Sequence, residues 1–159
     1  MCGIVGYIGD KQALPILIEG LKALEYRGYD SAGVAVHNGS HINISKAKGR
    51  LSVLEQRIDP DQLQGTLGIG HTRWATHGEP SDVNSHPHTN QSGDIAIVHN
   101  GIIENYMKLK DWLQKEGCVF VSETDTEVVA HLINYYYRGD LVEAVRSALD
   151  RIEGSYALG

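Results

Sequence analysis

Short apolar runs that end at a glycine or a polar turn divide this chain along its whole length. Eighteen glycines occur in 159 residues, and many of them stand at the ends of such runs. Apolar runs of about four to eight residues between turn signals are typical of strands, whereas a period near 3.6 is typical of helices. Because no linker or internal repeat interrupts the pattern, we expect one domain of short strands and helices joined by tight turns.

The spacing of the apolar residues predicts where these elements lie. Strands are expected over 3–8, 33–39, 41–47, 66–74, 94–101 and 118–122, with another beginning at 155. Helices are expected over 12–24, 50–58, 105–115 and 141–152, with one more starting at 124. Thr124 and Glu127 are spaced as a capping box for that last helix. Because the chain ends where an apolar strand begins, we expect it to be the N-terminal part of a longer protein.

Charge and cysteine content narrow the choice of partners and compartment. The formal net charge is −6, and the 14 basic residues form no cluster. We therefore expect neither nucleic acid nor a membrane as a partner. No apolar stretch approaches the roughly 20 residues that cross a bilayer, and nothing resembles a signal peptide. Two cysteines are too few for a disulfide framework, so we expect a reduced, cytoplasmic protein.

The second residue carries the most unusual chemistry in the sequence. Removal of Met1 would give Cys2 both a thiol and a free α-amine. A free cysteine is mostly thiol at neutral pH, because its pKa is about 8.5. An α-amine has a pKa of about 7.7–8.0 and can serve as the base, as in N-terminal threonine nucleophiles. The plainer interpretation is that Cys2 is a small buried residue that starts a strand.

Three further motifs offer polar groups, and each has a plainer interpretation. Arg73 in GHTRWATHG suits a bidentate carboxylate contact, or else a surface salt bridge. Asn100 and Gly101 follow DIAIV and suit an oxyanion hole, or else a turn. Asp125 in SETDTE suits a ligand ammonium, or else complements the dipole of the expected helix. Together they describe a site in which Cys2 attacks the side-chain carbonyl of an amino acid held by Arg73 and Asp125.

Six segments carry a resemblance to a known family. CGIVG, LEYRGYDSAG, GHTRWATHGEP, HPH, VHNGIIEN and SETDTE closely resemble the N-terminal glutaminase domain of the glutamine–fructose-6-phosphate aminotransferases, or glucosamine-6-phosphate synthases. The resemblance runs from Cys2 to the last residue, and related amidotransferases tend to differ at HTRWATHG. It implies an α+β fold of the N-terminal-nucleophile hydrolase type, a four-layer αββα sandwich of two antiparallel sheets. It also implies that residues 1–159 are a glutaminase domain truncated at its C-terminus, with the sugar-phosphate isomerase domain absent.

The resemblance also implies an activity. It implies hydrolysis of L-glutamine to glutamate and ammonia through a γ-glutamyl thioester on Cys2, with no cofactor and no metal. In the full-length enzyme the ammonia supplies nitrogen for glucosamine 6-phosphate synthesis from fructose 6-phosphate. Fructose 6-phosphate would bind only through the absent isomerase domain, and the full-length enzyme is expected to be a homo-oligomer.

Roles of single residues follow from the same resemblance. Cys2 matches the nucleophile, and Asn100 and Gly101 match the oxyanion donors. The positions that match glutamine-binding residues are Arg73, Trp74, Thr76, His77 and Asp125. Arg27 and Gly28 match the loop that supports the cysteine. Residues 73–80 match a mobile loop that closes over glutamine, and Trp74 matches a residue linked to control of ammonia passage.

Three alternatives remain open from the residues themselves. The eight histidines, with His86 and His88 in HPH, permit a metal site, although zinc sites usually show tighter ligand sets with Cys or acid partners. A non-catalytic module of the same fold would bind an amino acid or a partner through Arg73 and Asp125, without a processed N-terminus. Cys118 would be a nucleophile only with a histidine base, and its place at the start of CVFV favours packing instead.

Overall fold

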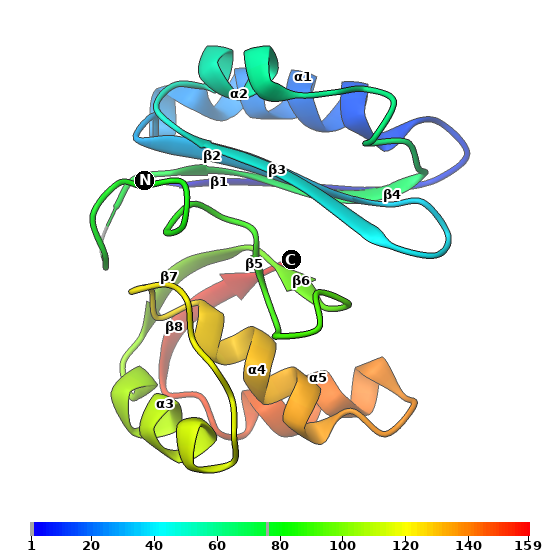
Figure 1. Cartoon of the computed structure of the whole chain (residues 1–159). Coiled ribbons are helices and arrows are strands. Elements are labelled where there is room, and N and C mark those ends of the chain that lie inside the picture. The colour runs from blue at the N-terminus through cyan, green and yellow to red at the C-terminus, as the bar shows by residue number, and fades with distance from the viewer. Residues whose placement is uncertain (1, 76) are drawn as a thin grey trace.

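The computed structural model of this chain describes residues 2–75 and 77–159. Two helices, a four-stranded sheet, a layer of short strands and a second group of helices follow one another as four layers (Figure 1). All the strand pairs in the described residues are antiparallel. This is the expected αββα arrangement, except that the second strand layer consists of two separate two-stranded sheets.

The larger sheet has the strand order β1-β4-β2-β3. Its strands are β1 (Gly3–Ile8), β2 (Ser31–His37), β3 (Ile42–Lys48) and β4 (Leu67–Arg73). Gly3 at the start of β1 pairs with Thr72 near the end of β4. This register places Cys2, the residue before β1, beside the loop that follows β4.

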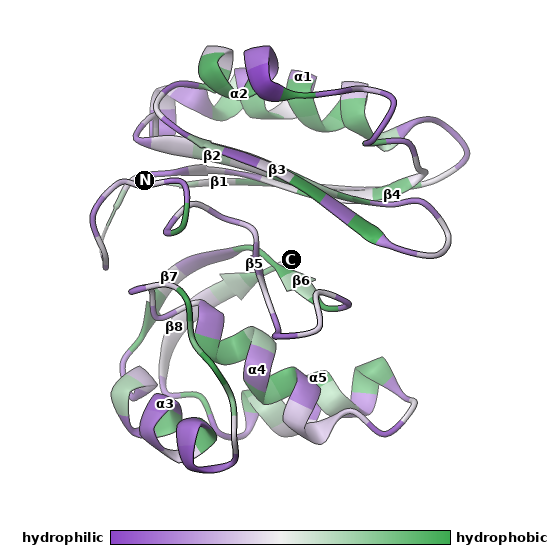
Figure 2. Ribbon diagram, viewed as in Figure 1, coloured by the Kyte–Doolittle hydropathy of each residue, from purple (hydrophilic) through white to green (hydrophobic). Residues whose placement is uncertain are grey.

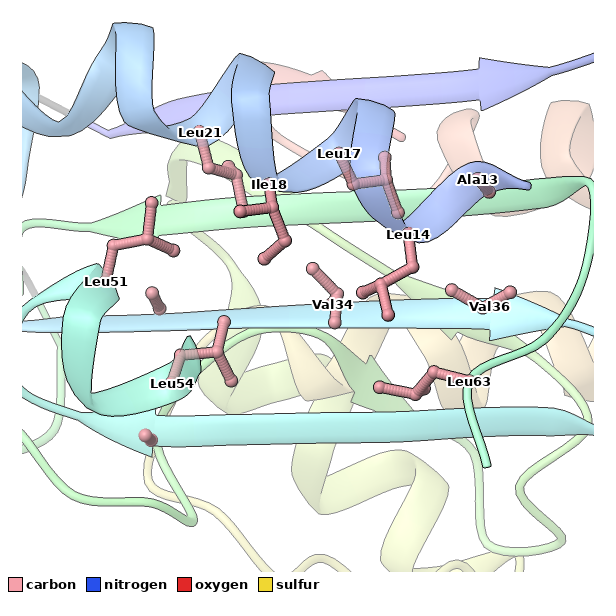
Figure 3. Close-up of a cluster of buried hydrophobic side chains, with 12 residues drawn as sticks. Ala13, Leu14, Leu17, Ile18, Leu21, Val34, Val36, Leu51, Leu54 and Leu63 are labelled. Atoms are coloured by element: carbon pink, nitrogen blue, oxygen red, sulfur yellow. The ribbon is translucent and has the colours of Figure 1, made fainter. Parts of the chain in front are cut away.

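Two helices cover one face of the larger sheet, α1 (Ala13–Leu24) and α2 (Leu51–Arg57). In Figure 3, Leu17 and Leu21 of α1 lie over β4, and other α1 side chains reach toward β2, where Val34 and Val36 are buried. The first six residues of β2 are all buried, because the second half of the molecule covers the opposite face. Gly33 permits this close packing, since a Cβ there would stand 2.0 Å from the backbone oxygen of His86.

The second half is built around one central helix. Its elements are β5 (His88–Thr89), β6 (Ala96–Ile97), β7 (His99–Ile103), α3 (Tyr106–Lys115), α4 (Glu127–Tyr136), α5 (Leu141–Leu149) and β8 (Gly154–Leu158). The first seven residues of α4 are buried, because α3, α5, β5 and β6 all contact it. Figure 2 shows hydrophobic and hydrophilic residues alternating around α4. None of the helices in the described ranges has both the length and the apolar character needed to cross a membrane.

The strand expected over 94–101 is divided in the structure. β6 pairs with β5, whereas β7 pairs with β8, so the chain changes its partner at Val98. The Val98 N–H donates to the backbone oxygen of Gly159 at 2.9 Å. Asn100 and Gly101 therefore lie inside a strand, and the simple-turn interpretation of this dipeptide is wrong.

The segment before α4 also differs from expectation. Residues 118–122 form no strand, because a side chain rather than a neighbouring strand accepts two of their N–H groups. The Glu127 carboxylate accepts from the N–H of Val121 at 2.9 Å and from that of Ser122 at 2.7 Å. The predicted capping box is therefore wrong: α4 begins at Glu127 itself, and no side-chain hydrogen bond from Thr124 caps it.

Lys46 on β3 connects the larger sheet to the loop before β5. Its ammonium donates to the carbonyls of Val83 at 3.2 Å, Ser85 at 2.9 Å and Pro87 at 3.2 Å. Burial lowers the pKa of this amine. Because an ammonium has three donors and each finds an acceptor here, the loop is held firmly against the sheet.

Replacing Lys46 with methionine is expected to lower the free energy of unfolding by about 2–3 kcal/mol, because the three carbonyls lose a charged donor. Urea denaturation measures this difference. Lys48 lies on the same strand with its side chain exposed, so K48M is the matched control. We expect K48M to stay within about 0.5 kcal/mol of the unchanged protein. Equal stability of the two variants would contradict the role assigned to the Lys46 ammonium.

Candidate active site

A cavity of about 580 Å³ lies between the residue before β1, the end of β4, and the strands β7 and β8. Ten site residues are predicted from the sequence, and eight of them line this cavity: Cys2, Arg27, Arg73, Trp74, His77, Asn100, Gly101 and Asp125. Gly28 is not among the lining residues but packs against the end of β4. Thr76 lies outside the described residues. The cavity therefore unites residues that are more than a hundred positions apart in the sequence.

Cys2 lies at the cavity wall, immediately before β1. The Trp74 N–H donates to the cysteine sulfur at 3.2 Å, and the same sulfur lies 3.5 Å from the Trp74 carbonyl oxygen. The removal of Met1, which would free the α-amine of Cys2, concerns a residue outside the described ranges.

Arg73, the last residue of β4, is a buried cation with an exposed fraction of only 3%. One guanidinium nitrogen, Nη2, donates to the carbonyl oxygens of His77 and, at 3.0 Å, of Gly78. The other, Nη1, is buried and has no hydrogen-bond partner among the described residues. Burial lowers the pKa of Arg73, although nearby acidic groups oppose this effect. A surface salt bridge is therefore the wrong interpretation, and the unused donor is suited to the carboxylate of a ligand.

Asp125 is the second buried charge of the cavity, with an exposed fraction of 3%. Its Oδ2 accepts from the Ile103 N–H at 2.8 Å, and its Oδ1 lies 4.0 Å from Nδ1 of His77. Asp125 precedes the first residue of α4 by two positions, so it lies just before the helix rather than in its first turn. A cavity that holds both Arg73 and Asp125 offers complementary charges to the carboxylate and the ammonium of an amino acid.

Asn100 and Gly101 present polar groups of β7 to the same cavity. The Asn100 Nδ2 donates to the carbonyl oxygen of Cys2 at 3.3 Å, which places this amide next to the candidate nucleophile. Gly101 has a φ of +118°, and a Cβ there would stand 2.0 Å from the backbone oxygen of Ser155. Only glycine fits this position without displacing β8. An amide donor and a side-chain-free backbone beside a thiol meet the requirements of an oxyanion hole.

The loop after α1 packs against the end of β4 from another side. It begins with the short helix η1 (Glu25–Arg27), and Arg27 lines the cavity. A Cβ on Gly28 would stand 2.8 Å from the carbonyl of Arg73 and 3.0 Å from the Trp74 nitrogen. Glycine therefore permits this loop to support the peptide group that donates to the Cys2 sulfur. That contact favours the supporting role predicted for the loop, which stays a prediction.

Four buried histidines, His71, His86, His88 and His99, form a cluster beside the cavity. The rings of His71 and His86 stack with their centroids 4.1 Å apart, and His86 meets His88 edge to face at 4.8 Å. Burial lowers the pKa of His71 to about 4 and that of His88 to about 3, so both are neutral at pH 7. Over residues 2–75 and 77–159, no three His, Cys, Asp or Glu side chains are grouped in a way that would hold a metal ion.

The second cysteine does not line the cavity. Cys118 packs against the apolar cluster of the second half, and burial raises the pKa of its thiol. A thiol with a raised pKa is a weak nucleophile. The structure therefore favours the packing interpretation of Cys118.

Several parts of the site were missed in the sequence, among them Asp30 and a stretch of β8. The Asp30 carboxylate accepts from the N–H of Ala75 and, at 2.9 Å, from the Ser31 hydroxyl, so it fixes the start of the loop after β4. Residues 155–157 of β8 form one wall of the cavity. Asp30 lies in the segment EYRGYDSAG, which pointed to this region, but no sequence signal indicates that β8 pairs with β7.

Known proteins resemble this chain in sequence. A family model described as a glutamine amidotransferase domain matches residues 71–159. The chain is 72% identical over 159 residues to the glutamine–fructose-6-phosphate aminotransferase (isomerizing) of Caldanaerobacter subterraneus subsp. tengcongensis, and it covers 26% of that protein. It is 65% identical over 159 residues to the enzyme of the same name from Clostridium tetani, again covering 26%. The chain thus spans about a quarter of the length of these curated relatives.

Solved structures show the same architecture. The glutamine phosphoribosylpyrophosphate amidotransferase of B. subtilis, complexed with ADP and GMP, superposes with a TM-score of 0.85 at 30% identity, covering 99% of this chain and 34% of that one. A second structure, described as the allosteric regulatory enzyme of purine biosynthesis, gives a TM-score of 0.87 at 30% identity with the same coverage. These neighbours confirm the expected α+β fold of the N-terminal-nucleophile type. The family model covers more than half of the chain, and the protein described here belongs to the glutamine amidotransferase domain family.

Proposed function

We propose that this chain hydrolyses L-glutamine to glutamate and ammonia, with Cys2 as the nucleophile. The observation that carries the proposal is a single cavity lined by the Cys2 thiol, the Asn100 and Gly101 donors, the Arg73 guanidinium and the Asp125 carboxylate. Membership of the amidotransferase family supports the same reaction class. The size of the cavity, about 580 Å³, lies within the range typical of small-molecule sites.

Substrate binding uses the two buried charges. The unpaired Nη1 of Arg73 would bind the α-carboxylate of glutamine, and Asp125 would accept from the α-ammonium. Fixing the α-carboxylate and the α-ammonium of glutamine leaves its side-chain amide to extend toward Cys2. A substrate held in this way reacts as though intramolecularly, which removes much of the entropic barrier to attack. Trp74 and His77 also line the cavity and would contact the bound glutamine.

The chemistry consists of two displacements at the amide carbon. The α-amine of Cys2 takes the thiol proton, and the thiolate attacks the carbonyl carbon to form a tetrahedral intermediate. Asn100 Nδ2 and the Gly101 N–H stabilise its oxyanion. The C–N bond then breaks, the α-amine returns its proton to the leaving nitrogen, and ammonia leaves a γ-glutamyl thioester on Cys2. Water adds to the thioester carbonyl, the C–S bond breaks, and glutamate and the free thiol are regenerated.

We also propose that residues 1–159 work as the glutaminase part of a longer enzyme. The names of the relatives support this, because each is an aminotransferase that acts with glutamine and fructose 6-phosphate. In such an enzyme the ammonia would supply nitrogen for glucosamine 6-phosphate, and a sugar-phosphate isomerase domain outside this chain would bind fructose 6-phosphate. A cytoplasmic location, a homo-oligomeric full-length enzyme and a role of Trp74 in ammonia passage belong to the same proposal.

Covalent labelling tests the function directly. The purified protein is incubated with a glutamine-analogue electrophile and analysed by intact-mass and peptide mass spectrometry. We expect one adduct, on Cys2, no Met1 on the labelled chain, and protection by excess glutamine. Labelling of Cys118 instead, or normal turnover by protein that retains Met1, would contradict the mechanism. Binding of glutamine without release of glutamate would favour the non-catalytic amino-acid-binding module.

Replacing Arg73 with methionine is expected to lower kcat/KM for glutamine by about 10² to 10³, because a buried charge partner of the carboxylate is lost. Most of the change should lie in KM, since the clamp binds the ground state and the transition state alike. Steady-state glutaminase assays measure both constants. Arg57, which pairs with Asp82 on the surface, provides the control variant R57M. An unchanged KM in R73M, or an equal loss in R57M, would refute the clamp.

A further inference from the structure

His71 lies between the strand that ends at Arg73 and the strand that carries Asn100. Its exposed fraction is 1%, and its Nε2 lies 2.9 Å from Asn100 Oδ1 and 3.1 Å from the carbonyl oxygen of His99. The family resemblance gives His71 no role, and His71 does not line the cavity. The contact with Asn100 nevertheless joins it to the candidate oxyanion hole.

The two oxygens fix the protonation of the ring. The His99 carbonyl oxygen is only an acceptor, so Nε2 has to carry the hydrogen that it donates. With a donor at Nε2, the Asn100 side chain has to turn its oxygen toward His71 and its NH₂ group away. The other ring nitrogen, Nδ1, is buried without a hydrogen-bond partner in the described ranges, and the ring stacks on His86 at 4.1 Å. Burial lowers the pKa of His71 to about 4, so the neutral ring keeps this arrangement at pH 7.

The orientation of Asn100 decides what the nucleophile meets. With its oxygen bound to His71, the amide presents Nδ2 toward Cys2, whose carbonyl oxygen accepts one of its hydrogens at 3.3 Å. An amide NH₂ has two hydrogens, so the second remains available to a ligand in the cavity. The reversed amide would turn an oxygen toward the developing oxyanion and repel it.

We propose that His71 is a positioning residue of the oxyanion hole: its Nε2–H fixes the Asn100 amide so that Nδ2 points to the reacting carbonyl. This inference rests on the proposed glutaminase function. His71 touches neither substrate nor nucleophile in this role and acts only through Asn100. Loss of the Nε2–H donor therefore lowers kcat rather than raising KM for glutamine.

A double-mutant cycle tests the proposal. Removal of one oxyanion donor typically lowers kcat by about 10² to 10³, which is the loss we expect for Asn100→Ala. We expect a smaller loss of kcat, about 10 to 10², for His71→Leu, because the Asn100 amide is then misoriented rather than removed, and KM should stay within about threefold of the unchanged protein. In the double variant, kcat should match that of Asn100→Ala within about threefold, because no amide remains to be oriented. A further tenfold loss in the double variant would overturn the proposal.

Two more variants separate positioning from a structural role. His71→Gln places an amide N–H near the position of Nε2, so we expect kcat to recover to within about fivefold of the unchanged protein. His131 is equally buried at 1% but bonds to Glu127 on α4, so His131→Leu is the matched control, with kcat expected to change less than about threefold. Losses of equal size in His131→Leu and His71→Leu would show a general effect of removing a buried histidine and would overturn the proposal.

A measurement on the unchanged protein keeps the test decisive if His71→Leu fails to fold. Nuclear magnetic resonance of isotopically labelled histidine reports which ring nitrogen carries the proton. We expect His71 to be neutral with its proton on Nε2 at pH 7, and a proton on Nδ1 alone would overturn the proposal. Failure of the proposed function is recognised separately: the unchanged protein would then release no more glutamate than Cys2→Ala, whatever the state of His71.

Discussion

Replacing Cys2 with alanine is expected to abolish glutamine hydrolysis, with a loss of kcat of about 10⁴-fold or more. Without the nucleophile the γ-glutamyl thioester cannot form. Only substrate binding and oxyanion stabilisation then remain to accelerate hydrolysis. The Cys2 sulfur has the position this requires, since it lies at the cavity wall with the Trp74 N–H 3.2 Å away. Glutamate release, followed with a coupled dehydrogenase, measures the loss.

Two controls make the result on Cys2 specific. Cys2→Ala should still bind glutamine in a calorimetric titration, because Arg73 and Asp125 are unchanged and lie elsewhere on the cavity wall. Cys118→Ala removes the other thiol, which packs in the apolar cluster, and should retain kcat within about threefold. Comparable glutamate release by Cys2→Ala and the unchanged protein would remove Cys2 from the mechanism.

Lowering the pH from 7 to 5 is expected to reduce the free energy of unfolding by about 4 kcal/mol through His71 and His88 alone. Burial lowers their pKa values to about 4 and about 3, whereas in the unfolded chain both titrate near 6.5. The unfolded state therefore binds more protons in this window, so stability is fully present above pH 6.5 and is lost as the pH falls toward 4. His86 and His99 are shifted in the same direction, also through burial.

Urea denaturation at pH 7 and pH 5 measures this loss. Most carboxylates remain ionised at pH 5, so the window isolates the histidines. The variant His88→Gln keeps a polar partner for the Thr124 hydroxyl, which lies 3.1 Å from Nε2 of His88, but does not titrate. Its stability should fall by about 2 kcal/mol less over the same interval. Identical denaturation curves at the two pH values would show that the cluster is not buried as described.

Local patterns predicted most of the elements correctly. The strand Gly3–Ile8 has the predicted limits, and α1, α2, β2, β3, β4, α3 and β8 lie within one or two residues of expectation. The helix expected over 141–152 is shorter and ends at Leu149. Apolar period and glycine position are local properties, and these elements follow them. The failures occurred where hydrogen-bond partners did not follow the apolar pattern. The strand expected over 94–101 is divided because β6 and β7 pair with different strands. The Glu127 carboxylate accepts from the main chain of 121–122 rather than capping its own helix.

In the candidate site, too, local sequence indicated the residue types, whereas burial and strand pairing depended on distant residues. Cys2, Arg73 and Asp125 were identified from residue type and motif, but the burial of Arg73 and Asp125 was not, because exposure depends on what packs over a residue. Arg73 was compatible with a surface ion pair until the structure showed it 3% exposed, with Nη1 unpaired among the described residues. Asp30 and the wall formed by β8 appeared only in the folded chain, since a sequence carries no direct sign of which strands pair.

The sequence by itself determined the chemical groups available here: a thiol at position 2, an amide followed by glycine at 100–101, and charges of opposite sign at 73 and 125. It also determined most of the short strands and helices, because these depend mainly on neighbours along the chain. Only the tertiary structure decided that the four sets of groups share one cavity and that the nitrogen of Asn100, not its oxygen, lies toward Cys2. The physical reason is that strand pairing and the His71 hydrogen bond join residues far apart in sequence, and such contacts exist only once both halves have packed together.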